Sequence, residues 1–390
     1  MMKLDSCLYW LLTAYLRCLA WLPSYVRKDA EEGAPRALLT GTFHSSNWIR
    51  AHLQPMLDSS RFDAVTMVTT SDVCLPDGVE TIRPPSWLSK IIGDRASRIL
   101  TFVVVAVRRR PEVIGGFHLI FSGLIAILLS RVLGARSIYF CFDGPAEVVR
   151  PSASSQRLET ALTQAVSFAD VVVTMGSSAA EYMKQRAAPK LVVVNPGGVH
   201  QPQPEAVEKT HDLIFLGRLV PVKNLAAQIE AVSLLRGQGN SLTLAIVGDG
   251  ECLEPLQQLV RARGVQDHVS FAGRQSETVR WLRSARVFVL SSYSEGLALS
   301  LMEALAAGIP AVVPNVGDLT DLVKDGYNGV VLTETTPQAI ADAVRWLLTE
   351  DRYAVAARNA AQSALYVSPA RAAARWANTM QHLGWHKCAA

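Results

Sequence analysis

The feature that most constrains the fold of this sequence is an alternation, beginning after Pro35, of short β-branched runs with longer amphipathic segments. Such an alternation is typical of α/β proteins whose strands form parallel sheets. The chain has 390 residues, and a single hydrophobic core usually stops growing at about 250–300 residues. We therefore expect an α/β fold with two domains.

Strands and helices can be placed along the first half from the period of its apolar residues. The run TFVVVAV, inside Ile99–Val107, is almost continuously apolar, which predicts a strand buried on both faces of a parallel sheet. The other expected strands are Ala37–Thr40, Ala64–Val68, Val113–Gly116, Ser137–Phe142, Val171–Val173 and Leu191–Val194. The expected helices are Asn47–Leu57, Phe121–Leu133, Ser155–Phe168 and Ser177–Arg186.

A segment rich in glycine, proline and charge, Asn195–Asp212, predicts a linker. We place one domain at 34–200 and a second at 201–366, with a last helix, 367–384, packing back on the first domain. The second domain repeats the pattern, with expected strands Leu213–Leu216, Leu242–Val247, Val269–Ala272, Val287–Leu290, Ala311–Pro314 and Val330–Leu332. Two such Rossmann-like halves imply a cleft, in which ligands bind beyond the carboxyl ends of the strands.

Residues 1–33 carry an apolar and aromatic stretch, broken by Arg17 and Pro23. A spanning helix would place Arg17 near its centre, at a cost of roughly 2.5–3.5 kcal/mol. A secretory signal is disfavoured by Asp5 and by the lack of a small-residue cleavage site. We expect a helix on the membrane surface, with a helix packed on the protein itself as the first alternative.

Composition excludes several classes of function. The net charge is +4 and no long basic run occurs, so we expect no nucleic-acid partner. The six cysteines lie far apart without metal-ligand spacing, so we expect no metal site and no disulfide framework. Sparse cysteine usage of this kind fits a reducing compartment.

Two glutamates mark the end of an expected strand in the second half. Glu295 lies in the loop after Val287–Leu290, and Glu303 follows in the first turns of the next helix, with seven residues between them. The amides of Gly296, Leu297 and Ala298 would point outward at the helix start, where unpaired N–H groups and the helix dipole favour phosphate. Carboxylates beside them suit sugar hydroxyls. Acidic residues are also common in helix first turns for structural reasons alone.

A second group of candidates follows an earlier strand. In FLGRLVPVKN the strand ends at Gly217 and is followed closely by Arg218 and Lys223. A guanidinium fork and an ammonium point charge leaving one strand end can both bind a diphosphate. If these two residues were ordinary solvated loop charges, they would not need to lie so close to a strand end.

With these motifs together, the sequence resembles the family 4 retaining glycosyltransferases, also described as glycosyl transferases group 1. The resemblance is in register over Leu213–Leu332 and looser over Ala37–His200. It rests on GRLVPVK, VGDGE, VSFAGR, the spaced glutamates and EALAAGIPAVVPNVGDLTDLVKDGYNGVVL. It implies the GT-B fold, with two Rossmann-like domains facing across a cleft, and a nucleoside-diphosphate sugar as donor.

The resemblance also implies roles. Arg218 and Lys223 would bind the donor diphosphate, Glu295 would contact the transferred sugar, and Glu303 would hold the ribose. The backbone at Gly273 and Arg274 would face the base, and no metal or other cofactor would be needed.

The first half departs from the family pattern. TGTFHSSN keeps only Gly41 of the usual glycine-rich loop, and Asp143 stands where many members have a histidine. The acceptor-side candidates are therefore Gly41, His44, His118 and Asp143, each with a structural role as the alternative.

The expected function is transfer of a sugar, with retention, to an acceptor hydroxyl on a glycan or lipid-linked intermediate of a bacterial polysaccharide. We expect the protein in the cytoplasm, peripheral on the inner face of the membrane. The alternatives are a GT-B epimerase or phosphorylase, and a non-catalytic partner subunit.

Overall fold

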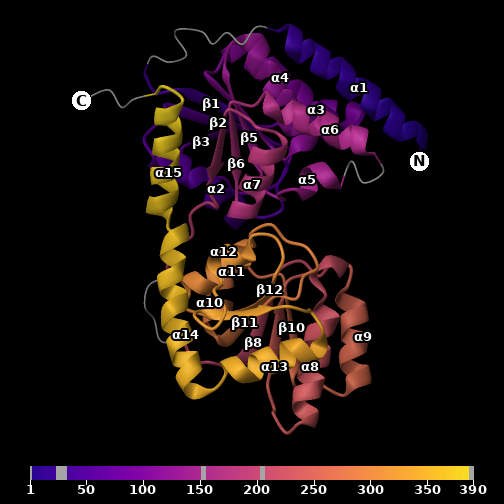
Figure 1. Cartoon of the computed structure of the whole chain (residues 1–390), viewed down its shortest axis with the longest axis vertical. Helices are drawn as coiled ribbons and strands as arrows, with labels where there is room; N and C mark the ends of the chain where they lie inside the picture. Colours follow the sequence, from indigo (N-terminus) through magenta and orange to yellow (C-terminus); the bar gives the residue numbers. More distant parts are fainter. Residues whose placement is uncertain (1, 23–32, 151–154, 203–206, 386–390) are drawn as a thin grey trace. The chain divides into compact units, whose positions relative to one another are not determined.

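The computed structural model describes residues 2–22, 33–150, 155–202 and 207–385, and of residues 2–8 only the backbone. Its contacts divide the chain into two compact units (Figure 1). Unit 1 comprises Met1–Gly198 and Pro369–Ala390, and unit 2 comprises Val199–Ser368. The predicted boundary lay after residue 200, whereas this division falls between Gly198 and Val199.

Unit 1 contains a seven-stranded parallel sheet in the order β3-β2-β1-β4-β5-β6-β7. The strands are β1 (Arg36–Thr40), β2 (Ala64–Val68), β3 (Val79–Ile82), β4 (Val113–Phe117), β5 (Arg136–Cys141), β6 (Val171–Thr174) and β7 (Leu191–Val194). Strand order reverses at β1 and β4, because the chain runs outward from β1 to β3 and then returns to β4. Ligands of open α/β sheets bind at such a reversal.

Helices cover both faces of this sheet. They are α1 (Met2–Trp21), α2 (Ser46–Asp58), α3 (Ser86–Arg109), η2 (Leu119–Gly123), α4 (Leu124–Leu133), α5 (Ala146–Val149), α6 (Gln156–Ser167), α7 (Ser177–Arg186) and α15 (Pro369–His382). Figure 1 shows α3, α4 and α6 on one side of the strands, with α1 beside them, and α15 on the other side, where it packs on α2.

The predicted strand at Ile99–Val107 was wrong, because these residues form the second half of helix α3. Phe102 and Ala106 are buried, whereas Leu100, Val104 and Val107 are exposed. Burial therefore follows the helical period, and the run looked continuous only because the outer face of the helix is apolar too. The prediction also omitted β3, a short edge strand with two exposed central residues.

Helix α1 packs on unit 1 through one side. Leu12 and Leu19 are buried in the core that contains α6, and the Tyr15 hydroxyl donates a 2.8 Å hydrogen bond to the Leu124 carbonyl. Within the described residues, no helix is both long and apolar enough to cross a bilayer. Residues 23–32 of the predicted segment 1–33 lie outside the described residues.

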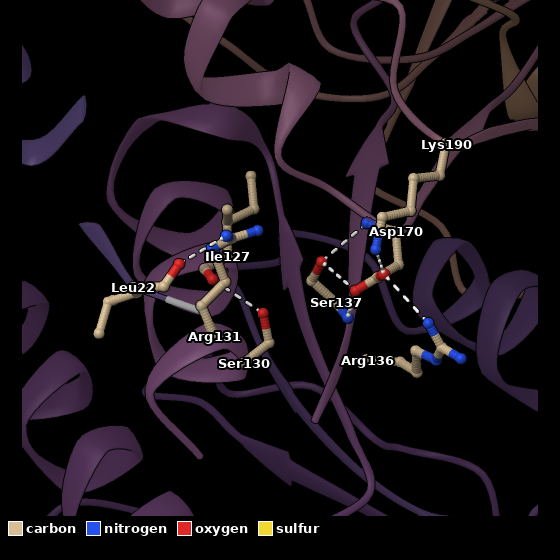
Figure 2. A network of polar contacts seen from close by, with 8 residues as sticks. All are labelled: Leu22, Ile127, Ser130, Arg131, Arg136, Ser137, Asp170 and Lys190. Atoms are coloured by element: carbon tan, nitrogen blue, oxygen red, sulfur yellow. Dashed lines mark hydrogen bonds and ion pairs between the residues drawn. The ribbon is translucent and has the colours of Figure 1, made fainter. Parts of the chain in front are cut away.

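Polar contacts fasten the amino ends of the strands in unit 1 (Figure 2). The Asp170 carboxylate accepts from Ser137 and from Lys190, whose Nζ lies 2.6 Å away, while Arg136 is 3.5 Å from it. Nearby, Arg131 donates to the Leu22 carbonyl at 2.9 Å and so holds the end of α1 on α4. This network lies at the opposite end of the strands from the β1–β4 reversal, and it stabilises the fold rather than a ligand site.

Unit 2 contains a six-stranded parallel sheet in the order β10-β9-β8-β11-β12-β13. Its strands are β8 (His211–Leu216), β9 (Leu244–Val247), β10 (Val269–Gly273), β11 (Ala285–Val289), β12 (Ala311–Pro314) and β13 (Gly329–Leu332). Its helices are η3 (Pro221–Lys223), α8 (Leu225–Gly237), α9 (Leu253–Arg263), α10 (Thr278–Arg283), α11 (Leu299–Ala306), α12 (Leu319–Leu322), α13 (Pro337–Leu347), α14 (Glu350–Ser363) and η4 (Ala364–Val367). The order reverses between β8 and β11, and both predicted groups of donor residues follow these two strands.

Candidate functional site

The reversal in unit 2 brings Lys223 and Glu295 together although 72 positions separate them. Lys223 Nζ lies 2.5 Å from Glu295 Oε1, and the side chains are 16% and 9% exposed. Ser292 Oγ donates to the same oxygen at 2.6 Å. Both bonds end on Oε1, and within the described part of the chain none is recorded to Oε2, which therefore remains available to a ligand hydroxyl.

Backbone contacts hold the loops of Lys223 and Glu295 against each other. The Tyr293 amide donates to the Val222 carbonyl at 2.9 Å. Ser291 Oγ donates to the carbonyl of Lys223 or Asn224, at 3.0 and 2.9 Å, and accepts from Gln228. Ser291 and Ser292 are fully buried. The ion pair is thus set by the packing of two strand ends rather than by flexible surface side chains.

Glycines allow the neighbouring loops to approach closely. A Cβ on Gly248 would lie 1.8 Å from the Gly217 carbonyl oxygen, and a Cβ on Gly317 would lie 2.1 Å from that of Glu295. Gly317 also has a φ of +58°, in the left-handed region that favours glycine. The loops after β8, β9, β11 and β12 therefore form one packed surface at the carboxyl edge of the sheet.

Helix α11 begins at this surface. Its N-cap is Ala298, which provides no side-chain cap, and the first hydrogen bonds to the Ala298 carbonyl come from Leu301 and Met302. Among the described residues no partner is recorded for the amides of Gly296, Leu297 and Ala298, which is the state of a helix start that can receive an anion. Glu303 lies in this helix and is partly exposed.

The other donor-side predictions lie on the same edge. Arg218 is exposed directly after Gly217. Gly273, with a φ of +65°, ends β10 and accepts from the Gly248 amide at 2.9 Å, and Arg274 follows it exposed. Because β9 and β8 separate β10 from β11, Gly273 is linked to the Lys223–Glu295 pair only through the intervening loops.

In unit 1 the acceptor-side candidates follow β1, β4 and β5, near the corresponding reversal. Gly41 is buried, and a Cβ there would lie 2.6 Å from the Phe43 ring. His44 and Asp143 are exposed. His118 follows β4 with φ +63° and ψ 147°, a conformation that costs a residue with a side chain about 1–3 kcal/mol.

A buried carboxylate that the sequence did not suggest holds His118. Glu147 Oε1 lies 3.0 Å from His118 Nδ1 and accepts from the amides of Phe142 and Asp143. Its Oε2 accepts from the Leu119 amide at 2.7 Å and the Tyr139 hydroxyl at 2.8 Å. These five contacts show how the strained loop at His118 is held in place.

The electrostatics of this cluster follow from its burial. Burial by itself would lower the pKa of His118, but the hydrogen bond and charge of Glu147, together with Asp143, raise it. Burial would raise the pKa of Glu147, but His118 and the other donors lower it. The geometry therefore favours an imidazolium and a carboxylate.

Arg98 is a second residue that sequence reasoning missed. It is 3% exposed on α3, and Nη1 donates to Thr40 Oγ1 at 2.8 Å and Ser122 Oγ at 3.1 Å. No acidic partner is recorded for it within the described residues, and its Nε is buried without an acceptor. A buried cation lacking a counter-charge is costly, which marks this end of β1 as a place where an anion would be stabilised.

Residues 199–364 match the family model of glycosyl transferases group 1. A GDP-mannose-dependent alpha-(1-6)-phosphatidylinositol monomannoside mannosyltransferase from Mycobacterium tuberculosis is 33% identical over 153 residues, which cover 37% of this chain and 40% of that protein. A D-inositol 3-phosphate glycosyltransferase from Nocardioides is 31% identical over 192 residues, covering 42% of each. The chain thus matches about two fifths of the length of these relatives.

Solved structures resemble nearly the whole chain. HepE from Anabaena in complex with UDP-glucose gives a TM-score of 0.68 at 19% identity, covering 89% of this chain and 100% of that one. Sucrose-phosphate synthase from Thermosynechococcus elongatus gives 0.73 at 16% identity, covering 89% and 98%. At such identities the similarity establishes the fold. The chain has the GT-B fold, and its residues 199–364 match the glycosyl transferases group 1 family.

Proposed function

We propose that the protein transfers a sugar from a nucleoside-diphosphate sugar to an acceptor hydroxyl, with retention at the anomeric carbon. The observation that carries this proposal is the Lys223–Glu295 pair at the β8–β11 reversal, inside the segment that matches the family. Similar structures of HepE are complexes with UDP and with UDP-glucose, which supports a nucleotide-sugar donor.

The chemistry follows from the charges at this edge. In the transition state, negative charge builds on the departing diphosphate, and preorganised cations lower its energy. Lys223 supplies an ammonium group held by Glu295, and Arg218 supplies an exposed guanidinium on the loop after β8. The outward amides of Gly296, Leu297 and Ala298 add a helix start. Glu295 Oε2 would accept from a hydroxyl of the transferred sugar, so that Glu295 positions both the donor and the lysine.

These cations also support a reaction without a metal cofactor, because they neutralise the charge that a divalent ion would otherwise bind. Among the described residues, no cluster of histidine, cysteine and acidic side chains could hold a metal. Chelation of divalent ions during the transfer assay tests metal independence directly.

For the acceptor we propose a lipid-linked or polysaccharide intermediate at the inner face of the cell membrane. The Mycobacterium tuberculosis relative acts on a phosphatidylinositol monomannoside, which supports a lipid-linked acceptor. In unit 1, the buried Arg98 supports an acceptor that carries phosphate, because an anion would supply a counter-charge that no described acidic side chain supplies. His118 would orient the acceptor hydroxyl, held by Glu147.

The deciding experiment has two steps. First, UDP-, GDP- and ADP-sugars are screened for protection of the full chain against heat unfolding, since a ligand that binds the folded state raises its stability. Secondly, the donor found is supplied with a radiolabelled sugar and a membrane extract. We expect label to be transferred to the extract, and the new glycosidic bond to have the same anomeric configuration as the donor.

Other outcomes would replace the proposal. Epimerised donor without transferred label indicates an epimerase, and phosphate-dependent release of sugar phosphate indicates a phosphorylase. Absence of protection by every nucleotide sugar favours the non-catalytic partner subunit.

A further inference from the structure

Large apolar side chains are exposed mainly on one part of unit 1. Of the 20 such side chains among the described residues, three lie on α1, six on α3, and one each on η2 and α4. More than half of the exposed apolar surface residues therefore belong to four neighbouring elements. Contiguous apolar surface of this kind marks an interaction site in a folded protein.

Helix α3 shows the pattern most clearly. Leu100, Val104 and Val107 are 46%, 39% and 50% exposed, and their spacing places them on one side of the helix. Towards the N-terminus, beyond the bend at Gly93, Ile91 is 73% exposed. The opposite side of α3 is buried in the core of unit 1. The helix is thus apolar on its inner and outer sides, although only the inner side is needed for folding.

The outer sides of α1 and α3 belong to one surface, because α4 lies between the two helices. Leu129 of α4 shares a buried cluster with Phe102 of α3, whereas Ile127 of α4 shares another with Leu12 of α1. Val132 of α4 is 54% exposed. Figure 1 shows α1, α3 and α4 together on the same side of the sheet. We call the exposed residues of these helices the α1–α3 face.

The charges on this face are mostly positive. Lys90, Arg95 and Arg108 are exposed on α3 and Arg17 on α1, while Asp94 is the one exposed acidic side chain among the described residues of these two helices. Exposed tryptophans accompany them, Trp10 and Trp21 on α1 and Trp87 on α3. Apolar side chains with tryptophans and a basic border match the boundary of a bilayer that contains anionic lipids.

We propose that the α1–α3 face docks on a lipid bilayer with anionic headgroups, with α1 and α3 lying along its surface. A second copy of the chain fits the face less well, because a symmetric contact would bring the same cations against one another. This inference deepens the proposed function and rests on it for its biological meaning, since a docked enzyme would meet a lipid-linked acceptor. Docking itself requires neither donor nor acceptor.

Deletion of residues 1–33 is a poor test, because Leu12 and Leu19 are core residues and their loss would open unit 1. The test uses the full chain and two substitutions on exposed positions, Leu100→Glu with Val104→Glu. The matched control is Leu234→Glu with Val355→Glu, which changes two residues of 39% and 44% exposure in unit 2. Binding to vesicles of phosphatidylcholine, with or without phosphatidylglycerol, is measured by flotation without any sugar nucleotide.

We expect the wild-type chain and the control to float with the mixed vesicles, and the α3 variant to bind at least about tenfold more weakly. Removing Arg108 as Arg108→Gln should weaken binding to the anionic vesicles about fivefold and leave binding to neutral vesicles nearly unchanged. Wild-type chain that stays unbound, or an α3 variant that binds like wild type, overturns the proposal. A wild-type dimer that the α3 variant dissociates, without vesicle binding, would assign the face to self-association instead.

Vesicle binding and sugar transfer can fail independently, so the two proposals can be tested separately. Lys223→Met, which removes a residue of the donor site, should float like wild type even when transfer is lost. Protection of the α3 variant by nucleotide sugars against heat unfolding shows that its folding is intact.

Discussion

Replacing Lys223 by methionine should lower both stability and activity. A double variant separates the two losses. The change leaves Glu295, whose side chain is 9% exposed, with Ser292 as its remaining recorded partner. Breaking a buried ion pair from one side costs about 3–5 kcal/mol. Because Lys223 keeps 16% exposure and Ser292 still donates, we expect a loss of about 2 kcal/mol. In a unit of the size of unit 2, that lowers the melting temperature by about 4–8 °C.

The double variant Lys223→Met with Glu295→Gln removes both charges together. It should recover part of the lost stability, with a coupling of about 1–3 kcal/mol between the two sites. Activity should not recover, since the loss of a cation that stabilises the leaving group costs about 10²–10³ in kcat. Thermal unfolding by circular dichroism and steady-state transfer kinetics measure the two quantities on the same preparations.

The matched control is the ion pair between Arg263 and Glu230, at 2.6 Å on the surface of unit 2. Its double variant, Arg263→Met with Glu230→Gln, should change neither the melting temperature nor kcat measurably, because water already solvates these groups. If the Lys223 and Glu295 substitutions have additive effects on stability, the two side chains are not coupled as a buried pair. If Lys223→Met retains kcat within about threefold of wild type, Lys223 does not stabilise the leaving group.

Three further predictions concern other parts of the site. Gly317→Ala should lower the melting temperature and the nucleotide affinity more than Gly264→Ala does. Both glycines have a positive φ, +58° and +66°, but only at Gly317 would a Cβ lie 2.1 Å from a backbone oxygen. Equal losses in the two variants would show that the loop at Gly317 moves to accept the Cβ. Glu147→Gln should lower the pKa of His118 in an NMR titration, since burial then outweighs the weakened partner, and an unchanged midpoint would contradict the assigned contact. The stability that His118 contributes is present below its unfolded pKa of about 6.5 and is lost as pH rises through the raised folded value. The wild-type chain should therefore lose this part of its free energy of unfolding as pH rises, whereas the Glu147→Gln variant should not. Excess EDTA should leave transfer unchanged, and a more than about tenfold loss that Mg²⁺ restores would mean that the cations do not replace a metal.

The elements around the donor site could be predicted closely from sequence. Predicted strand Ala311–Pro314 has the observed bounds, and predicted strand Val269–Ala272 is one residue shorter than β10. In unit 2, buried strands are short apolar runs, and glycines mark their ends, so the period of the pattern is unambiguous. Helix α3 could not be predicted in this way, because the α1–α3 face makes its outer side apolar and removes the contrast on which periodicity depends.

Some residues of the candidate sites could be predicted from sequence and others could not. Lys223 and Glu295 could be named because each follows a strand in a recognisable motif, but their 2.5 Å contact depends on which strands are neighbours. Glu147 carried no such signal, since its role arises from five donors brought together by folding. A burial pattern in the sequence reports how apolar a position is, and it cannot report which polar groups surround an acid.

The path of the chain through unit 1 has a consequence for synthesis on the ribosome. The chain leaves this unit at Gly198 and returns at Pro369, so that helix α15, which packs on α2, is made only after unit 2. The Asn195 side chain, which donates to the Ala372 carbonyl at 3.2 Å, must likewise wait for that return. Until then α2 is left uncovered in the nascent chain, whereas unit 2 is continuous in sequence and can fold as soon as it emerges. We therefore expect unit 2 to finish folding during translation before unit 1 does.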